Sequence, residues 1–166
     1  MVTKAFWTAV VLNLVVLAWS AGELPEPVAT HFGASNQADD WSSRTGYLVF
    51  ALLLVLLTAG FLAGLAQWLR RSMPVSMISM PTKQRWIDAG QVPLLRSLMA
   101  DDLYGIGALT LLLFAVMQVL TVEANRHQPA VLSNWSWVVI ALYVVVLLAW
   151  TAWLTVVKYR RPPVGN

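Results

Sequence analysis

The residues best suited to chemistry gather in one polar stretch, VATHFGASNQADDWSSRTGY, which covers residues 28–47. His31 supplies one imidazole, and Asp39 and Asp40 supply two carboxylates. A metal site is not indicated, because no second His and no Glu stands beside His31 at ligand spacing. A serine hydrolase is not indicated either, because the nearby serines lack a nucleophile elbow and an oxyanion-hole motif. We therefore predict no catalytic residue, no metal and no cofactor, and expect His31 to hydrogen-bond within its loop.

Prolines and turn residues define the backbone around this stretch. Two prolines in Glu23–Pro27 forbid continuation of a preceding helix and favour an extended exit. Val28–Phe32 is rich in β-prone residues. Gly33 and Asn36 lie in the segment that follows, and both residue types tolerate positive φ. We predict a hairpin-like loop within residues 22–45.

Aromatic and hydroxyl residues indicate how this loop is held. We expect Phe32 and Trp41 to be its apolar anchors. Ser42 or Ser43 can accept a hydrogen bond from the first turn of the next helix. Arg44 then leaves a positive charge at that helix end. We predict an ordered loop.

The elements that position the loop are long and apolar. The chain has 166 residues, of which 58% are hydrophobic and 11% are charged, whereas a soluble domain carries about a quarter charged residues. Four stretches contain no Asp, Glu, Lys, Arg or His, and they cover residues 5–21, 46–69, 104–122 and 135–157. Each has about 17 to 24 residues, enough for a helix to cross a hydrocarbon core of about 30 Å. We predict an all-α, polytopic membrane protein with four transmembrane helices in a single domain, residues 1–166.

Positive charges predict the orientation. A cytoplasmic N-terminus puts nine basic residues inside, which are Lys4, Arg70, Arg71, Lys83, Arg85, Arg96, Lys158, Arg160 and Arg161. Only Arg44 and Arg126 then lie outside. The positive-inside rule therefore predicts that both termini are cytoplasmic, that residues 22–45 form an outer loop and that residues 70–103 form a cytoplasmic connection. This topology accounts for the net charge of +3, so we expect lipid-bilayer contact and no nucleic-acid partner.

The first apolar stretch also has features of a signal peptide. Lys4 precedes the apolar run, and the small-residue pattern Ala18-Trp19-Ser20 follows it. We expect this segment to be retained as a transmembrane span.

Polar and small residues inside the spans indicate helix packing. No span holds an ionisable residue, which argues against an ion-coupled transporter. We expect Asn13 to make an interhelical hydrogen bond. Gly60 and Gly64 form a small-xxx-small pattern, with Gly105 as a possible counterpart, and the notch can serve packing within the bundle or against another protein.

The connection between the second and third spans contains signals of helix. Pro93 favours the first turn of a helix that runs into the third span. Thr82 is a candidate N-cap for a short helix that lays Trp86 and Ile87 against the membrane interface. Asp101 and its neighbour Asp102 are expected to be hydrated or paired with Arg70 and Arg71.

Two segments resemble a known family. The first is Leu24-Pro-x-Pro-Val, then His31-Phe32, then Ala38-Asp39-x-Trp41-x-Ser43-Arg44, which resembles the outer loop of the bacterial SdpI-like family. The second is Met80-Pro81-Thr82-Lys83-x-x-Trp86, which is similar to that family's asparagine-proline-x-x-x-x-tryptophan segment. The family includes an immunity protein against a secreted toxin. Asn36 and Asp40 stand where the family usually or often has Gly.

The resemblance implies a non-enzymatic protein of the bacterial inner membrane with an immunity or sensing role. The outer loop would meet a peptide or envelope ligand, and the cytoplasmic connection would meet a regulator. The residues that this implies for ligand contact or loop architecture are His31, Phe32, Asp39, Trp41 and Arg44. The alternative is an accessory subunit whose transmembrane helices dock into a larger membrane protein complex.

Overall fold

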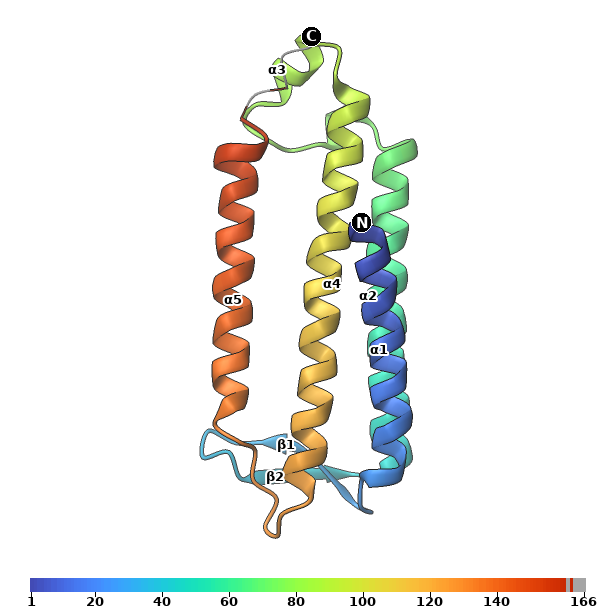
Figure 1. Cartoon of the computed structure of the whole chain (residues 1–166), viewed down its shortest axis with the longest axis vertical. Helices are drawn as coiled ribbons and strands as arrows, with labels where there is room; N and C mark the ends of the chain where they lie inside the picture. The colour runs from blue at the N-terminus through green and yellow to red at the C-terminus, as the bar shows by residue number, and fades with distance from the viewer. Residues whose placement is uncertain (161, 163–166) are drawn as a thin grey trace.

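The computed structural model describes residues 1–160 and residue 162, so Arg161 of the predicted inner charges lies outside the described residues. Helix α1 is followed by a hairpin, three helical segments before α4, and a final helix with a terminal π-helical turn (Figure 1). The bounds are α1 Val2–Glu23, β1 Val28–Phe32, β2 Ala38–Ser42, α2 Arg44–Arg71, η1 Val75–Met77, α3 Lys83–Asp88, α4 Val92–Asn125, α5 Trp135–Trp153 and η2 Leu154–Lys158.

The long helices make this a multi-pass membrane protein. Within the described part of the chain, four helices are long and apolar enough to cross a membrane, namely α1, α2, α4 and α5 with η2. Helix α4 has 34 residues and begins at Val92, with Pro93 in its first turn as predicted. At 1.5 Å per residue it is about 51 Å long, so it exceeds the membrane core by several turns. Its polar N-terminal part therefore belongs to the connection rather than to the apolar span.

Small residues allow α1, α2 and α4 to pack closely. A Cβ atom placed on Gly107 of α4 would lie 2.6 Å from the buried ring of Phe6 in α1. Helix α2 turns a buried stripe toward the bundle, with members Ala51, Val55, Ala59 and Ala66. Gly60 and Gly64 lie off this stripe and, among the described residues, have no neighbour within 4 Å of a would-be Cβ. The packed face of α2 is therefore made by alanines and valine beside the glycine notch.

A polar network crosses the centre of the bundle. The Asn13 amide donates to the Ala9 carbonyl in its own helix and to the Leu111 carbonyl in α4, each at 2.8 Å. The Gln118 amide donates to Asn13 Oδ1 at 3.0 Å. The predicted interhelical hydrogen bond of Asn13 is thus confirmed, and it fixes the register of α1 against α4.

Helix α5 lies alongside α4 with most of its surface exposed (Figure 1). Its contacts with α4 include a 3.0 Å hydrogen bond between Tyr143 and Thr110. A Cβ on Gly105 would lie 2.7 Å from the Trp150 ring, so Gly105 makes room for this indole. Further attachments of α5 are polar and lie at its two ends.

Candidate functional site

The hairpin has the geometry that its turn residues predict. Strands β1 and β2 pair antiparallel, with Val28 opposite Ser42 and Phe32 opposite Ala38. In the turn, the Asn36 N–H donates to the Gly33 carbonyl at 2.9 Å. Asn36 has φ 61°, whereas Gly33 stays outside the left-handed region. An asparagine therefore takes the conformation for which glycine is the usual residue.

The start of β1 is fixed to the C-terminal end of α4. Asn125 Oδ1 accepts from the Ala29 N–H at 2.8 Å, and Asn125 Nδ2 donates to the Ala29 carbonyl at 3.1 Å. This side chain therefore acts as an additional strand partner for β1. Val28 is fully buried and packs with Leu24 and Val122 in a small apolar cluster. Both interactions hold the hairpin across the ends of α1 and α4.

The tip of the hairpin is joined to the loop between α4 and α5. Asn36 Nδ2 donates to Asn134 Oδ1 at 2.6 Å, and Asn36 Oδ1 accepts from the Trp137 indole at 2.7 Å. The Leu132 N–H donates to the Asn36 carbonyl at 2.8 Å, and the Ala38 N–H donates to the Ala130 carbonyl at 3.1 Å. The turn is thus held to the α4–α5 loop and the start of α5 by backbone hydrogen bonds and by the side chain of Asn36.

An open polar hollow of about 470 Å³ lies between this turn and the α4–α5 loop. Its polar lining residues are Ser35, Asn36, Glu123, His127, Ser133 and Asn134. His127 Nε2 lies 3.6 Å from Glu123 Oε1, so an imidazole and a carboxylate stand together on one wall. The hollow offers both groups to a polar ligand, and the sequence interpretation did not find it.

Two predicted site residues form an exposed pair on the hairpin. His31 Nδ1 donates to Asp39 Oδ1 at 2.5 Å across the strands. This hydrogen bond, and then the negative charge of Asp39, raise the pKa of His31 above its ordinary value of 6.5. The predicted hydrogen bond of His31 within the loop is therefore present, and it favours the protonated form of this exposed imidazole.

Phe32, Trp41 and Arg44 have different surroundings. Trp41 is 52% exposed, so the expectation that it anchors the loop is wrong. The loop is anchored instead by buried residues that face the helix ends, namely Leu24, Val28 and Ala29. Phe32 is half-buried, and the Arg44 N–H donates to Glu26 Oε2 at 2.9 Å. Ser43 caps α2 as predicted, by accepting from the Gly46 N–H at 3.0 Å.

A second polar cluster lies at the opposite end of the bundle. Lys158 Nζ donates to both oxygens of Asp102 at 2.6 Å, and the Tyr159 hydroxyl donates to Asp102 Oδ2. Asp102 is only 8% exposed. Asp102 lies just before the predicted span of residues 104–122, in the part of α4 that extends beyond the charge-free stretch, and packing buries it there. Asp101 makes the predicted pair with Arg70 at 2.6 Å, but Asp102 binds the end of α5.

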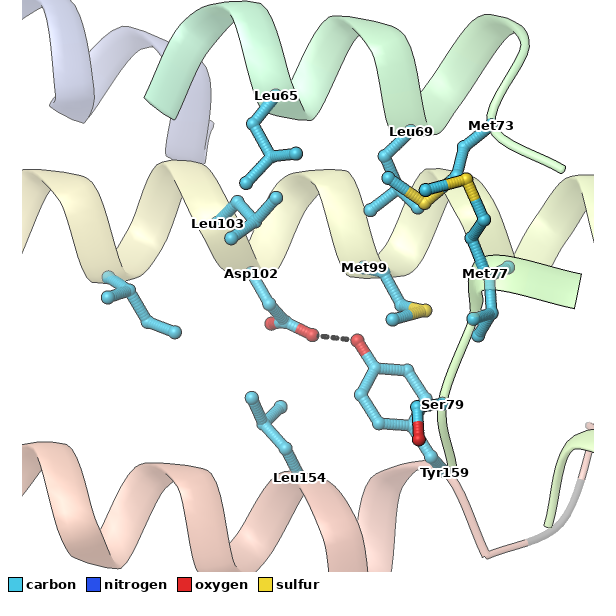
Figure 2. Close-up of a pocket in the computed structure, with 12 residues that line it drawn as sticks. Leu65, Leu69, Met73, Met77, Ser79, Met99, Asp102, Leu103, Leu154 and Tyr159 are labelled. Carbon is cyan, nitrogen blue, oxygen red and sulfur yellow. Dashed lines mark hydrogen bonds between the residues drawn. The ribbon is translucent and has the colours of Figure 1, made fainter. Parts of the chain in front are cut away.

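The second cluster stands at the wall of a mostly apolar pocket of about 270 Å³ (Figure 2). Helix α2 contributes Leu65 and Leu69, and three methionines contribute flexible side chains. Figure 2 shows the Asp102 carboxylate directed at the Tyr159 hydroxyl across this pocket. Burial, and then the bond to Asp102, raise the pKa of Tyr159, so its phenol remains a donor.

The short helix α3 closes the same end. Thr82 is the N-cap residue of α3, but its hydroxyl makes no cap and instead donates to the Tyr159 carbonyl at 2.6 Å. The Trp86 indole donates to the same carbonyl at 3.1 Å. Trp86 is 1% exposed, so the expectation that it lies at the membrane interface is wrong. Ile87 remains exposed.

The spacing of residues in the sequence did not predict that Asp102 and Lys158 would meet. Asp102 and Lys158 are 56 positions apart, and each lies next to a charge-free stretch rather than in it. One feature of the sequence could have predicted the contact. Asp102 lies at the start of the third span, and Lys158-Tyr159 lies at the end of the last span. Both ends face the same side in a four-span topology.

Comparison with known proteins finds a match for one segment of the chain. The family described as Domain of unknown function (DUF1648) matches residues 8–57. This segment contains most of α1, the whole hairpin and the first half of α2. No curated protein and no solved structure matches the chain. Among the described residues, no group of three His, Cys, Asp or Glu side chains is arranged to hold a metal ion.

Proposed function

We propose that this protein is a non-enzymatic inner-membrane protein of bacteria that senses, or gives immunity to, a peptide or envelope ligand through its hairpin. The observation that carries the proposal is the double attachment of the hairpin, through Asn125 to α4 and through Asn36 to the α4–α5 loop. A loop held at its base and its tip presents its surface with little conformational entropy left to lose on binding. The resemblance of the hairpin residues to the SdpI-like outer loop supports the same role.

The surface that remains free is suited to a polar, partly aromatic ligand. His31 and Asp39 place an imidazole and a carboxylate side by side, and both side chains are largely exposed. Trp41 adds a large exposed ring on the second strand. Exposed aromatic and charged residues on a rigid support are typical of binding surfaces.

The positive charges at the two ends support an orientation with the hairpin outside. The hairpin and α3 lie at opposite ends of the bundle (Figure 1). Arg44 and Arg126 belong to the hairpin end, whereas the connection of residues 70–103 and the end of α5 hold most of the other basic residues. The positive-inside rule favours a cytoplasmic α3 end, which puts the hairpin outside. In that orientation the hairpin meets ligands that arrive from the cell envelope.

Site-specific photo-crosslinking in living cells tests the proposal. A benzoylphenylalanine probe replaces Trp41 in one strain and Leu57 in another, because Leu57 is 69% exposed on α2 and faces away from the bundle. We expect the probe at position 41 to capture an envelope or secreted peptide, and the probe at position 57 to capture lipid. Capture of one integral membrane protein from both positions, with no peptide at position 41, would contradict the proposal. Toxin challenge of strains with His31→Ala and Trp41→Ala then tests immunity directly.

The second candidate function is an accessory subunit. The specific observation that favours it is the unpacked glycine notch on α2, where Gly60 and Gly64 stand beside the exposed Phe61 and Leu57. Such a notch lets another helix approach closely. In this case Gly60→Leu abolishes co-purification of the partner, and the hairpin variants leave it unchanged.

A further inference from the structure

The apolar pocket at the α3 end opens beside a buried charge pair, and this combination is suited to an amphipathic ligand. The pocket is formed by α2, α4, the connection after α2 and the end of α5 (Figure 2). Its aliphatic and methionine side chains include Leu65, Leu69, Met73, Met99 and Leu103. An apolar pocket with a few polar groups at one edge is the usual form of a small-molecule site.

The polar edge has hydrogen-bond donors to spare. An ammonium group has three N–H donors, and Lys158 uses two of them on the Asp102 oxygens. The Lys158 side chain is 22% exposed, and its ammonium is bound to Asp102, which lines the pocket although Lys158 itself does not. Ser79 is exposed at the pocket lining and adds a hydroxyl. Both groups favour a ligand whose head offers oxygen acceptors.

Charge decides which head is favoured. The basic side chains described at this end are Arg70, Arg71, Lys83, Arg85, Arg96, Lys158 and Arg160. The acidic ones are Asp88, Asp101 and Asp102, and the last two already pair with Arg70 and Lys158. The excess of positive charge attracts an anionic headgroup, as basic clusters at the cytoplasmic membrane surface do.

The pocket also lies at a depth that a lipid can reach. The exposed indoles of Trp68 and Trp153 stand at the ends of α2 and α5, where aromatic rings mark the membrane interface. Lys158 Nζ lies 5.8 Å from the centre of the Trp153 ring. We propose that this pocket binds an acyl chain of an anionic phospholipid, whose phosphate accepts hydrogen bonds from Lys158 and Ser79.

Native mass spectrometry of the full chain with defined lipids tests this inference. The probes are dioleoyl phosphatidylglycerol and dioleoyl phosphatidylcholine, which share acyl chains and differ in headgroup charge. Ser79→Trp places an indole at the exposed edge of the pocket to block lipid entry, and Met99→Trp fills the inside of the pocket. Ser76→Trp is the matched control, because Ser76 is exposed in the same connection and does not line the pocket.

We expect the wild-type chain to retain one phosphatidylglycerol about fivefold more strongly than phosphatidylcholine, the scale set by one basic residue near a membrane surface. Ser79→Trp and Met99→Trp should remove this preference, and Ser76→Trp should keep it. Equal retention of both lipids by the wild type, or full retention of phosphatidylglycerol by Ser79→Trp, would overturn the inference. Ser79→Trp decides the matter even where Met99→Trp does not fold, because residue 79 is at the surface.

Discussion

Asn36 occupies the tip of the hairpin with φ 61° and uses both atoms of its amide. The sequence indicated the backbone part of this role, because asparagine tolerates the left-handed region. It did not indicate the bonds to Asn134 and Trp137, which lie about a hundred positions away. In this hairpin, the chemistry of the turn could be predicted, and the long-range hydrogen-bond partners of Asn36 could not.

The first prediction concerns these side-chain bonds. Asn36→Gly keeps the positive φ accessible and removes the bonds to Asn134 and Trp137. We expect a loss of about 1–3 kcal/mol in local stability, because Trp137 loses its acceptor and Asn134 its donor. Hydrogen exchange of the hairpin amides should become faster while exchange in α1 stays unchanged. Unchanged protection of the hairpin would mean that Asn36 does not attach it.

The second prediction is a pH dependence of the hairpin. The pKa of His31 is raised by Asp39, so the pair stabilises the folded hairpin fully below the unfolded pKa of about 6.5. This contribution is lost as the pH rises through the higher folded pKa. Hydrogen exchange of β1 and β2, corrected for the intrinsic rate, should therefore rise with pH above about 6.5.

Asp39→Asn is the control for this titration. We expect it to return the pKa of His31 toward its ordinary value, as followed by the imidazole proton signals in an NMR titration. If the His31 titration midpoint is the same in the variant, the pair does not exist in solution.

At the element scale, the apolar stretches predicted where helices would lie but not which faces would meet. The glycines of α2 attract attention in the sequence, yet the buried stripe of α2 runs through Ala51, Val55 and Ala59. The alanine–valine face and the glycine face of α2 both repeat every four residues, so periodicity alone cannot predict which face is buried. The choice depends on partners such as Phe6 and Gly107, which come from other helices.

The third prediction compares two glycines on different faces. Gly107→Ala places a methyl group 2.6 Å from the Phe6 ring, which should destabilise the bundle by about 1–3 kcal/mol. Gly60→Ala meets nothing within 4 Å among the described residues, and should be neutral or stabilising by up to about 1 kcal/mol. Thermal unfolding of the purified variants measures both effects. Equal destabilisation by the two substitutions would contradict the helix packing.

The fourth prediction concerns the attachment of α5. Lys158→Met leaves Asp102 buried without its cation, and we expect a loss of about 3 kcal/mol. The double variant Asp102→Leu with Lys158→Met removes both charges and should recover most of that loss. Thermal unfolding of the single and double variants gives the comparison. A double variant as unstable as the single one would show that the charge pair does not determine stability here.

At the scale of the whole molecule, hydropathy predicted a four-span membrane protein, because charge-free apolar stretches of this length are typical of transmembrane helices. The two ends of the bundle were harder to predict, because each is assembled from loops far apart in the sequence. The hairpin end combines Asn36 with the α4–α5 loop, and the α3 end combines Trp86 with Tyr159. Polar contacts at both ends of the bundle hold α5 in place. The apolar middle of α5 packs only lightly against α4.

The fifth prediction is the orientation of these ends. The chain has no cysteine, so Ser35→Cys and Ser76→Cys each introduce a single thiol at an exposed position. In intact spheroplasts, a membrane-impermeant maleimide should label position 35 in the hairpin and spare position 76. Both positions should react after the membrane is opened. The reverse pattern would place the hairpin in the cytoplasm and exclude contact with envelope ligands.

The most direct test of the central claim is the composition of the intact particle. The protein is extracted from its native membrane in a polymer nanodisc without detergent, and its mass is measured by native mass spectrometry. A protein that acts through a free hairpin predicts particles that contain this chain and lipid, with or without a bound peptide. Stoichiometric recovery of larger membrane subunits that protect Trp41 from oxidation would contradict the hairpin account and establish an accessory subunit.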